Sequence, residues 1–449
     1  MTKEELLEKR ISAISLGCDK NKVDLENMLG RLKAYGFEII DDTYSADILI
    51  VNTCAFIQPA QEEAIANIIE AEYAKEKGII EKVIVTGCFP ERNYDSMKEN
   101  FPKIDAFLRL RENENICNVI EDLYQVTHSK PLKKYERVLT NSPSYAYLKI
   151  ADGCNNVCSY CTIPRIRGRY KSYPIDELVD EAKNLAERGV KELILVAQDT
   201  TRYGEDLYGE NCLIKLCEKL SKIKGISWIR IHYAYPEKVT EELLSYIDKN
   251  PKICKYLDIP LQHIDDEILS SMRRRLDEKG TRELIEKINT TYPNFALRTT
   301  FIIGYPGENG KKFKKLCEFI KNGYFDYAGF FPYSKEPNTA SFYMTKHLSS
   351  FTKKRRVRKI SKIQQNVMTG KANELIGQEM EVLVDYFDQT TGEFCGHSQK
   401  FSPLLDFGVR FVDNGSVKVC DFVKVKIYDF DGTDYKGEII WWIHLIKLH

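Results

Sequence analysis

The chain has 449 residues, of which 43% are hydrophobic and 29% charged, a composition typical of a globular protein with roughly three domains. Lys plus Arg and Asp plus Glu number 66 each, so the overall charge does not indicate a nucleic-acid partner. The first ten residues are rich in charge and lack an apolar signal region, and no stretch approaches the ~20 apolar residues of a membrane span. We therefore expect a cytoplasmic protein without a membrane partner, most simply a monomer.

Residues 9–126 alternate between short apolar runs and helical patterns, and this order predicts an open α/β domain with a parallel, buried sheet. The expected strands cover residues 11–17, 47–53 and 82–87, and the clearest helical patterns cover residues 23–35 and 60–77.

A cysteine directly follows each of these three strands, at Cys18, Cys54 and Cys88 (the amino-terminal cysteines). Because the carboxyl ends of parallel strands meet at one edge of a sheet, we expect the three thiols to lie together. Three independent buried cysteines would not explain why each takes the same place after a strand. The pattern therefore predicts a three-thiolate metal site. Asn52 and Thr53 either donate hydrogen bonds to its sulfur atoms or cap the next helix.

Residues 140–371 contain six repeats of a strand followed by a helical stretch, which predicts a barrel or partial barrel of βα units. The expected strands cover residues 145–151, 192–198, 228–234, 255–262, 295–303 and 327–333, with helices such as 175–187 and 267–274 between them. Barrels of this kind form their sites at the carboxyl ends of the strands.

The first of these strands is followed by Cys154, Cys158 and Cys161 (the loop cysteines), spaced C-x3-C-x2-C. Their segment is polar, unlike a core that buries inert cysteines. An odd total of thirteen cysteines argues against a disulfide framework, and a structural zinc site would need a fourth ligand nearby. The spacing predicts a 4Fe–4S cluster held by three thiolates, with one iron left open for a ligand.

Polar residues stand at the ends of the other strands of this region, and together they predict a polar ring suited to a charged small molecule. A single histidine in such a place is more often structural. The ring comprises Gln198, Asp199, His232, Gln262, His263 and Arg298.

Residues 374–447 carry alternating patterns, as in 380–384 and 422–427, which predict a small five-stranded β-barrel. Residues 376–449 hold seven Lys and Arg against twelve Asp and Glu. An acidic module suits a basic protein better than RNA, whose phosphates require cations, although a merely solvated acidic surface is the alternative. The preceding basic run 353–359, inside an expected helix, either contacts RNA or forms a solvated face.

The loop cysteines, with Tyr160 before the last of them, resemble the radical S-adenosylmethionine (SAM) signature. Together with the amino-terminal cysteines, the barrel and a last domain similar to TRAM domains, nearly the whole chain resembles the methylthiotransferases. One branch of that family modifies an adenosine beside the tRNA anticodon, and the RimO-type branch modifies an aspartate of the small-subunit ribosomal protein at the decoding centre. The segments that resemble the RimO-type branch are 15–24, 195–204, 258–263 and 298–304.

The resemblance implies SAM and two 4Fe–4S clusters, one on each set of three cysteines. The cluster on the loop cysteines binds SAM and, after reduction by an electron donor, cleaves it to a 5′-deoxyadenosyl radical, which removes hydrogen from the β-carbon of the substrate aspartate. The cluster on the amino-terminal cysteines supplies sulfur, and a second SAM supplies the methyl group. Candidate SAM contacts are Tyr160, Gln198, Asp199 and Arg298.

One segment departs from the family: residues 396–403 lack the usual Arg-Ser pair and acidic, proline-containing stretch, which leaves the docking of the partner open. Two rival functions stay open as well. The first is a tRNA-modifying enzyme, which should need a basic last domain. The second is an iron–sulfur electron carrier with an RNA- or ribosome-binding module, which does not need an iron with an open ligand position. The other seven cysteines show no ligand spacing, and we expect them to be structural.

Overall fold

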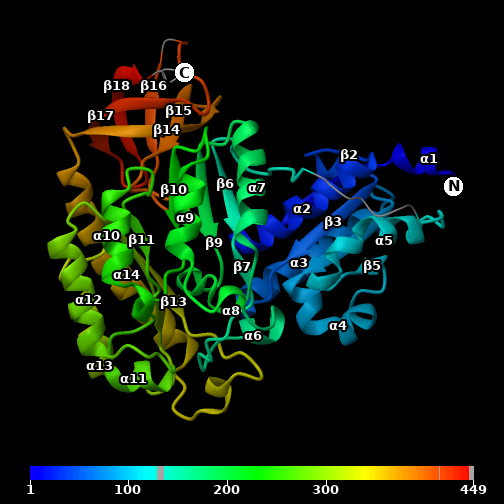
Figure 1. Cartoon of the computed structure of the whole chain (residues 1–449). Helices are drawn as coiled ribbons and strands as arrows, with labels where there is room; N and C mark the ends of the chain where they lie inside the picture. The colour runs from blue at the N-terminus through cyan, green and yellow to red at the C-terminus, as the bar shows by residue number, and fades with distance from the viewer. Residues whose placement is uncertain (129–135, 414, 444–449) are drawn as a thin grey trace.

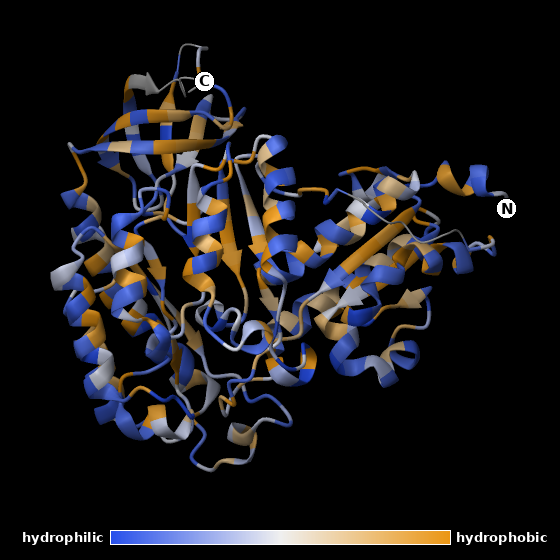
Figure 2. Cartoon of the chain, viewed as in Figure 1, coloured by the Kyte–Doolittle hydropathy of each residue, from blue (hydrophilic) through white to orange (hydrophobic). Residues whose placement is uncertain are grey.

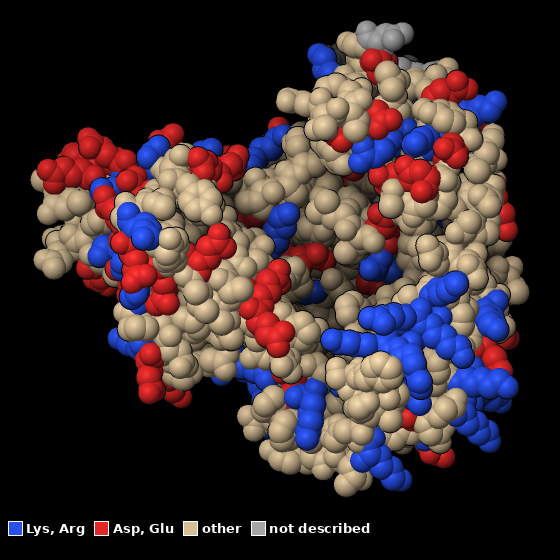
Figure 3. Space-filling model, turned by 180° about the vertical axis from the view of Figure 1, so that it is seen from behind, with Lys and Arg blue, Asp and Glu red and all other residues tan. Residues whose placement is uncertain are grey.

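The computed structural model describes residues 1–128, 136–413 and 415–443. An amino-terminal α/β unit, a central βα unit and a carboxy-terminal barrel follow one another along the chain (Figure 1). Seen from behind, the molecule is hollowed where the three units meet (Figure 3). No helix in the described ranges has both the length and the apolar character needed to cross a bilayer. Residues 444–447 of the expected last domain lie outside the described residues.

The amino-terminal sheet is parallel throughout, in the order β2-β1-β3-β4-β5, as the alternating pattern predicted. Helices cover both of its faces, which is why all six residues of β3 are buried. The edge strands β2 and β5 were not expected, because two residues carry no readable alternation. The elements are α1 (Lys3–Leu7), β1 (Arg10–Ser15), α2 (Asp19–Tyr35), β2 (Glu38–Ile39), β3 (Ile48–Thr53), α3 (Gln58–Glu76), β4 (Lys82–Gly87), α4 (Cys88–Asn100), β5 (Ala106–Phe107) and α5 (Ile116–Leu123).

The central unit contains all six predicted strands, in two parallel three-stranded sheets, β10-β9-β6 and β11-β12-β13. A parallel bridge between Ile229 of β10 and Ile253, three residues before β11, joins the two sheets, so that the unit forms a partial barrel. The strands are β6 (Tyr145–Lys149), β9 (Glu192–Val196), β10 (Trp228–Ile231), β11 (Tyr256–Asp258), β12 (Ala296–Ile303) and β13 (Tyr327–Pro332). Two short strands, β7 (Ala151–Asp152) and β8 (Lys171–Ser172), pair separately.

Helices surround the central strands because each presents an apolar stripe at intervals of three and four residues. In α7 the stripe is Ile175, Leu178, Ala182 and Leu185, all buried against the strands. Hydrophobic residues accordingly gather on the strands, and hydrophilic ones on the outer helical surfaces (Figure 2). The helices are α6 (Ile163–Ile166), α7 (Ile175–Glu187), α8 (Glu205–Tyr208), α9 (Leu213–Ser221), α10 (Glu241–Lys249), α11 (Asp266–Ser271), α12 (Glu278–Thr291), α13 (Gly310–Lys321) and α14 (Ser350–Glu374).

The last unit is a closed five-stranded barrel in the order β14-β15-β16-β18-β17, which confirms the predicted small β-barrel. Most neighbouring strands are antiparallel, and β16 and β18 are parallel. The strands are β14 (Glu379–Asp388), β15 (Glu393–His397), β16 (Val409–Val412), β17 (Phe422–Phe430) and β18 (Tyr435–Ile443).

Residues 398–406, in the loop that joins β15 to β16, lie at the amino-terminal end of the central barrel. Arg230 is fully buried there and donates to the carbonyl oxygens of Ser398 and Gln399, at 3.1 and 2.8 Å. Its guanidinium also pairs with the equally buried Glu192 at 2.7 Å. The first residues of four strands pack in one apolar cluster with the last barrel: Trp228, Tyr256, Ala296 and Tyr327.

His397, the last residue of β15, is buried between two carboxylates at this junction. Its Nε2 lies 2.6 Å from Glu192 Oε2, and its Nδ1 lies 2.8 Å from Asp385 Oδ2. Burial opposes the charged form, but the two carboxylates outweigh it and raise the pKa of His397 to about 9. Because the folded pKa lies above the ordinary 6.5, the imidazolium stabilises the fold fully below pH 6.5, and this stability is lost as the pH rises through 9.

Replacement of His397 by glutamine should therefore lower the free energy of unfolding by about 3 kcal/mol at pH 6. The difference from the unsubstituted protein should shrink between pH 6.5 and pH 9, as measured by urea unfolding. His128→Gln is the matched control, because His128 is exposed and its ion pair with Asp122 lies at the surface. A difference that stays constant from pH 6 to pH 9 would contradict this assignment of the buried charge.

Candidate metal and cofactor site

The fold brings the three amino-terminal cysteines to one edge of the first sheet. Cys18 precedes the first turn of α2, Cys54 follows β3, and Cys88 is the first residue of α4. The parallel register aligns β1, β3 and β4, so that the three strands end at similar heights. Burial is the main cause of the raised pKa of Cys54 and of Cys88, and negative charge on the neighbouring Cys18 would raise both further, which requires the three thiols to lie close together.

Two glycines let the chain turn this tightly before a cysteine. Gly17 has a φ of +93°, and a Cβ on it would lie 2.6 Å from the Cβ of Cys54. Gly87 has a φ of +99°, and a Cβ there would lie 2.7 Å from Asn52 Oδ1. That amide oxygen is buried without a hydrogen-bond partner among the described residues. Neither Asn52 nor Thr53 caps α3, whose N-cap is Ile57.

The loop cysteines follow β7, at the carboxyl end of the first barrel strand. The amide of Asn156 donates to Cys154 Sγ at 3.4 Å, and the amide of Cys161 donates to the carbonyl oxygen of Cys158 at 3.1 Å. The hydroxyl of Tyr235 lies 2.8 Å from Cys158 Sγ. Polar groups therefore already face the sulfur atoms, as they do around bound iron–sulfur clusters.

Backbone contacts from the far side of the barrel fix the middle of this loop. The amide of Ser159 donates to the carbonyl oxygen of Met272 at 3.2 Å, and its own carbonyl oxygen accepts from Ser341 at 2.8 Å. The hydroxyls of Ser159 and Tyr305 are 2.7 Å apart. The loop is thus held by the chain that follows the fourth, fifth and sixth strands.

The chemistry of both sets of thiols fits a metal cluster. Burial raises the pKa of Cys154 to about 11 and those of Cys88 and Cys161 to about 12. A thiol that keeps its proton at neutral pH needs a bound metal to displace it. Within the described ranges no three His, Cys, Asp or Glu side chains converge closely enough for a single metal ion. A 4Fe–4S cluster does not require three ligands to converge on one metal ion, because each thiolate binds a different iron.

The two sets of cysteines belong to adjoining loops of different units. The Thr162 hydroxyl, next to Cys161, donates to the carbonyl oxygen of Phe56 at 3.2 Å, two residues after Cys54. Arg167 directly follows α6, the short helix after the loop cysteines, and its Nη2 lies 3.7 Å from Cys88 Sγ. The structure therefore brings the two candidate metal sites next to each other at the boundary between the amino-terminal and central units.

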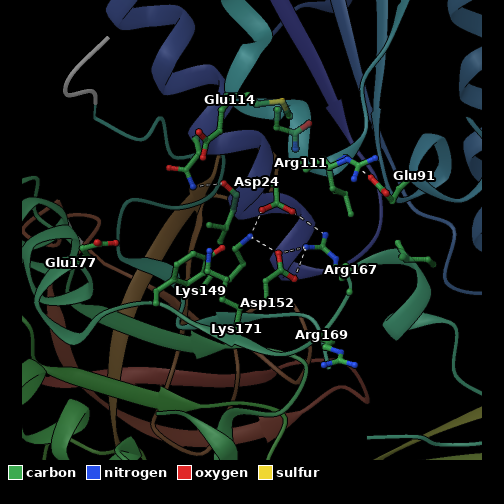
Figure 4. Close-up of a pocket in the computed structure, with 18 of the residues that line it drawn as sticks. Asp24, Glu91, Arg111, Glu114, Lys149, Asp152, Arg167, Arg169, Lys171 and Glu177 are labelled. Carbon is green, nitrogen blue, oxygen red and sulfur yellow. Dashed lines mark hydrogen bonds and ion pairs between the residues drawn. The ribbon is translucent and has the colours of Figure 1, made fainter. Parts of the chain in front are cut away.

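Arg167 is the centre of a buried ion cluster that spans this boundary (Figure 4). Its guanidinium lies 2.9 Å from Asp24 Oδ2 of the amino-terminal unit and 3.0 Å from Asp152 Oδ2 of the central unit. Lys149 pairs with the same two carboxylates. Burial opposes ionisation of Asp152, but Lys149 and Arg167 outweigh it and hold its pKa well below the ordinary value.

A cavity of about 800 Å³ opens beside this ion cluster, between α2 on one side and the segment after the loop cysteines on the other (Figure 4). Its walls carry both signs of charge. Besides the ion cluster, the charged lining includes Arg31, Glu91, Arg111, Glu114, Arg165, Arg169, Lys171, Glu177 and Glu181. The cavity reaches Arg167, and through it the vicinity of Cys88.

Three of the four candidate SAM contacts lie around the loop cysteines. Tyr160 packs against an apolar cluster that includes Met272 and Tyr305. Gln198 donates to Asp152 Oδ1 at 3.3 Å, and its own Oε1 is buried without a partner in the described part of the chain. Because buried polar atoms are nearly always hydrogen-bonded, that oxygen marks a place for a ligand atom.

Asp199 is fully buried and holds the cysteine loop directly. It accepts hydrogen bonds from Asn156 at 2.8 Å, Thr201 at 2.7 Å and Arg202 at 3.1 Å. Burial nevertheless raises its pKa. Its carboxylate is therefore largely occupied by the protein, so that its visible role is to position Asn156 and Cys154.

Arg298 is not brought to the cysteine loop. It stands in the first half of β12, forms an ion pair with Asp406 and donates to the carbonyl oxygen of Leu405 at 3.2 Å. Both partners belong to the loop of the last barrel. The sequence indicates only that Arg298 lies in a strand. It does not show which end of the barrel the residue is near.

Sequence reasoning missed two arginines of the site, Arg167 and Arg274. The guanidinium of Arg274 lies 4.0 Å from the ring centre of Tyr235, whose hydroxyl contacts Cys158. Neither arginine belongs to a spacing motif. Only their nearness to the cysteines in space distinguishes them from the other basic residues.

A partial βα barrel with three closely spaced cysteines after its first strand defines a radical SAM protein. Residues 148–320 match the model of the Radical SAM superfamily, residues 376–440 that of the TRAM domain, and residues 10–109 that of an uncharacterized protein family, UPF0004. Among solved structures, the radical SAM methyltransferase TsrM from Kitasatospora setae shares the fold, with a TM-score of 0.53 and 14% identity over 72% of this chain and 73% of that chain.

Relatives that match nearly the full length of the chain show to which family of radical SAM proteins it belongs. The ribosomal protein uS12 methylthiotransferase RimO of Elusimicrobium minutum is 44% identical over 96% of this chain and 100% of its own length. The protein of the same name from Aquifex aeolicus is 42% identical over 95% and 97%. The chain therefore belongs to the RimO family of radical SAM methylthiotransferases. As such it is a transferase that uses SAM and a 4Fe–4S cluster.

Proposed function

We propose that this chain transfers a methylthio group to the β-carbon of an aspartate in the ribosomal protein uS12, and that it uses two 4Fe–4S clusters to do so. The observation that carries the proposal is the contact between the two cysteine loops, through Thr162 and Phe56 and through Arg167 and Cys88. A reaction that first removes hydrogen from a carbon and then places sulfur on it needs both sites within reach of one substrate atom.

When bound, the two clusters supply the hard chemistry: reductive cleavage of SAM at the loop cysteines and sulfur at the amino-terminal cysteines. The chain itself binds and orients. Asp199 and Asn156 hold Cys154 in place, and Gln198 Oε1, which has no hydrogen-bond partner among the described residues, can accept a hydrogen bond from SAM. Tyr160 offers an apolar wall beside the loop. We assign Tyr160, Gln198 and Asp199 to the SAM site on these grounds, and Arg298 to the junction with the last barrel.

The last barrel supports a protein substrate rather than a tRNA. With seven basic and twelve acidic residues between positions 376 and 449, it is poorly suited to phosphates and well suited to a basic ribosomal protein. The relatives bear the name of uS12 methylthiotransferases, which agrees with this charge argument. We further propose that the protein acts in the cytoplasm as a monomer and receives its electrons from a separate reductant.

Competition between the two substrates of the family tests the proposal. The reconstituted, reduced protein is supplied with SAM, uS12 and bulk tRNA together, and both products are analysed by mass spectrometry. We expect a methylthio mass gain on one aspartate of uS12 and none on tRNA. The same gain on a tRNA adenosine would keep the chemistry and overturn the substrate. Release of deoxyadenosine without either product would indicate a radical SAM enzyme with another target. If no deoxyadenosine is released, the protein is an electron carrier.

A further inference from the structure

The helix that leads into the last barrel carries an exposed, one-signed surface. Residues 350–373, nearly all of α14, contain eight Lys and Arg and no Asp or Glu, although basic and acidic residues balance over the whole chain. Five of the eight are exposed, and none of these five forms an ion pair with another described residue. We call them the basic face of α14: Lys354, Arg355, Arg358, Lys359 and Lys362.

The helical repeat places the basic face on one side of α14. At 3.6 residues per turn, its five side chains fall within about 140° of the circumference and span about 12 Å along the axis. The opposite side packs inward: Ile360 and Gln364 are buried, and Arg356 pairs with Glu308. The charge on the basic face is therefore not used to hold the helix in place.

The surroundings extend this basic surface rather than neutralise it. Seen from behind, Lys and Arg form a broad continuous area on the central unit, beside the hollow where the three units meet (Figure 3). Phe351, one turn before Arg355, is 73% exposed, and the Arg355 guanidinium lies 6.0 Å from its ring centre. A row of cations beside an exposed aromatic ring is suited to binding a folded RNA, because phosphates pair with the cations and unpaired bases stack on the ring.

We propose that the basic face of α14 binds the phosphate backbone of RNA next to the substrate aspartate, so that the protein acts on uS12 within a ribonucleoprotein particle. This inference rests on the proposed function, which supplies a substrate that is surrounded by RNA. The acidic barrel and the basic helix are consecutive in the chain, because α14 ends at Glu374 and β14 begins at Glu379. The acidic barrel then faces the basic protein uS12, and the adjoining basic face of α14 faces the RNA.

Salt-dependent binding tests the contact without any bound cluster. The variant replaces Lys354, Arg355, Arg358 and Lys359 by alanine, which favours the helix. The control removes the same charge from exposed lysines of α9, of the turn after it and of α10: Lys215, Lys222, Lys224 and Lys249. Binding to purified small ribosomal subunits is measured by sedimentation between 50 and 200 mM salt, about the range where phosphate contacts weaken steeply.

We expect the slope of log affinity against log salt to be shallower by about 3 in the variant, and its affinity at low salt to fall about tenfold or more. The control should match the unsubstituted protein. Equal slopes for variant and unsubstituted protein would overturn the proposal. So would a variant that binds subunits normally but has lost binding to anionic lipid vesicles, since that result assigns the surface to a membrane.

Activity on two forms of uS12 separates this inference from the proposed function. Both variants should methylthiolate free uS12 at the unsubstituted rate, and only the basic-face variant should lose activity on assembled subunits. An equal loss on free uS12 would place α14 at the protein substrate and overturn the RNA contact. If even the unsubstituted protein modifies neither form, the proposed function fails, while the salt slopes still decide whether α14 binds RNA.

Discussion

Replacing Cys54 by alanine should abolish methylthiolation while SAM cleavage continues. Cys54 lies at the sheet edge with Cys18 and Cys88, on a different unit from the loop that the radical SAM chemistry requires. Its loss should remove about four iron atoms per chain, because a cluster rarely persists on two thiolates. The measurements are iron content, deoxyadenosine release and the methylthio mass gain on uS12.

Cys158→Ala is the informative counterpart, because it should remove a similar amount of iron and stop both deoxyadenosine release and methylthiolation. Cys317→Ala is the control: it lies in the interior of α13, where alanine is favourable, and it should leave all three measurements unchanged. Full methylthiolation by Cys54→Ala would exclude the amino-terminal cysteines as the sulfur-supplying site.

Substitution of Arg167 by methionine should destabilise the protein by about 3 kcal/mol or more. The side chain is 1% exposed, and its removal leaves Lys149 as the remaining cationic partner of Asp24 and Asp152 among the described residues. A buried carboxylate that loses its partner is costly, because neither water nor another cation replaces the lost contact. Urea unfolding measures the loss. Arg165→Met, two residues earlier and exposed, is the control and should change little.

The same substitution should also lower the yield of methylthiolated product for each SAM cleaved, by about tenfold or more, since a displacement of an ångström between reacting groups has such effects. Arg167 contacts Asn21 and Cys88 on one side of the boundary and Asp152 on the other, so its loss loosens the register of the two units. Arg167→Lys keeps the charge without the forked geometry and should give an intermediate yield. An unchanged yield with reduced stability would limit Arg167 to a purely structural role.

The order of strands and helices was predictable because each carries a local signal. β4 covers residues 82–87 and α7 covers residues 175–187, the ranges that the sequence pattern predicts. The same holds for the placement of the cysteines, since parallel strands necessarily end at one edge. Signals of this kind lie within a dozen neighbouring residues.

What the sequence could not predict depends on contacts between distant segments. Arg298 is a clear example: its strand is correctly placed, but its partner Asp406 lies 108 positions away, in a loop without regular structure. The pairing of Arg167 with Asp24 has the same character, because it depends on how two separately folded sheets meet. Neither residue type nor spacing contains that information.

Rotation of the last barrel away from the central unit would separate Arg230 and Arg298 from their partners in the loop 398–406. Buried polar contacts are costly to break, so these contacts favour the orientation of the barrel that the structure shows. A polypeptide bound to it reaches the cysteine loop only with the residue that lies at the right distance along its length. Selection among chemically identical aspartates then depends on the length of substrate chain between the segment that binds the barrel and the aspartate that is modified.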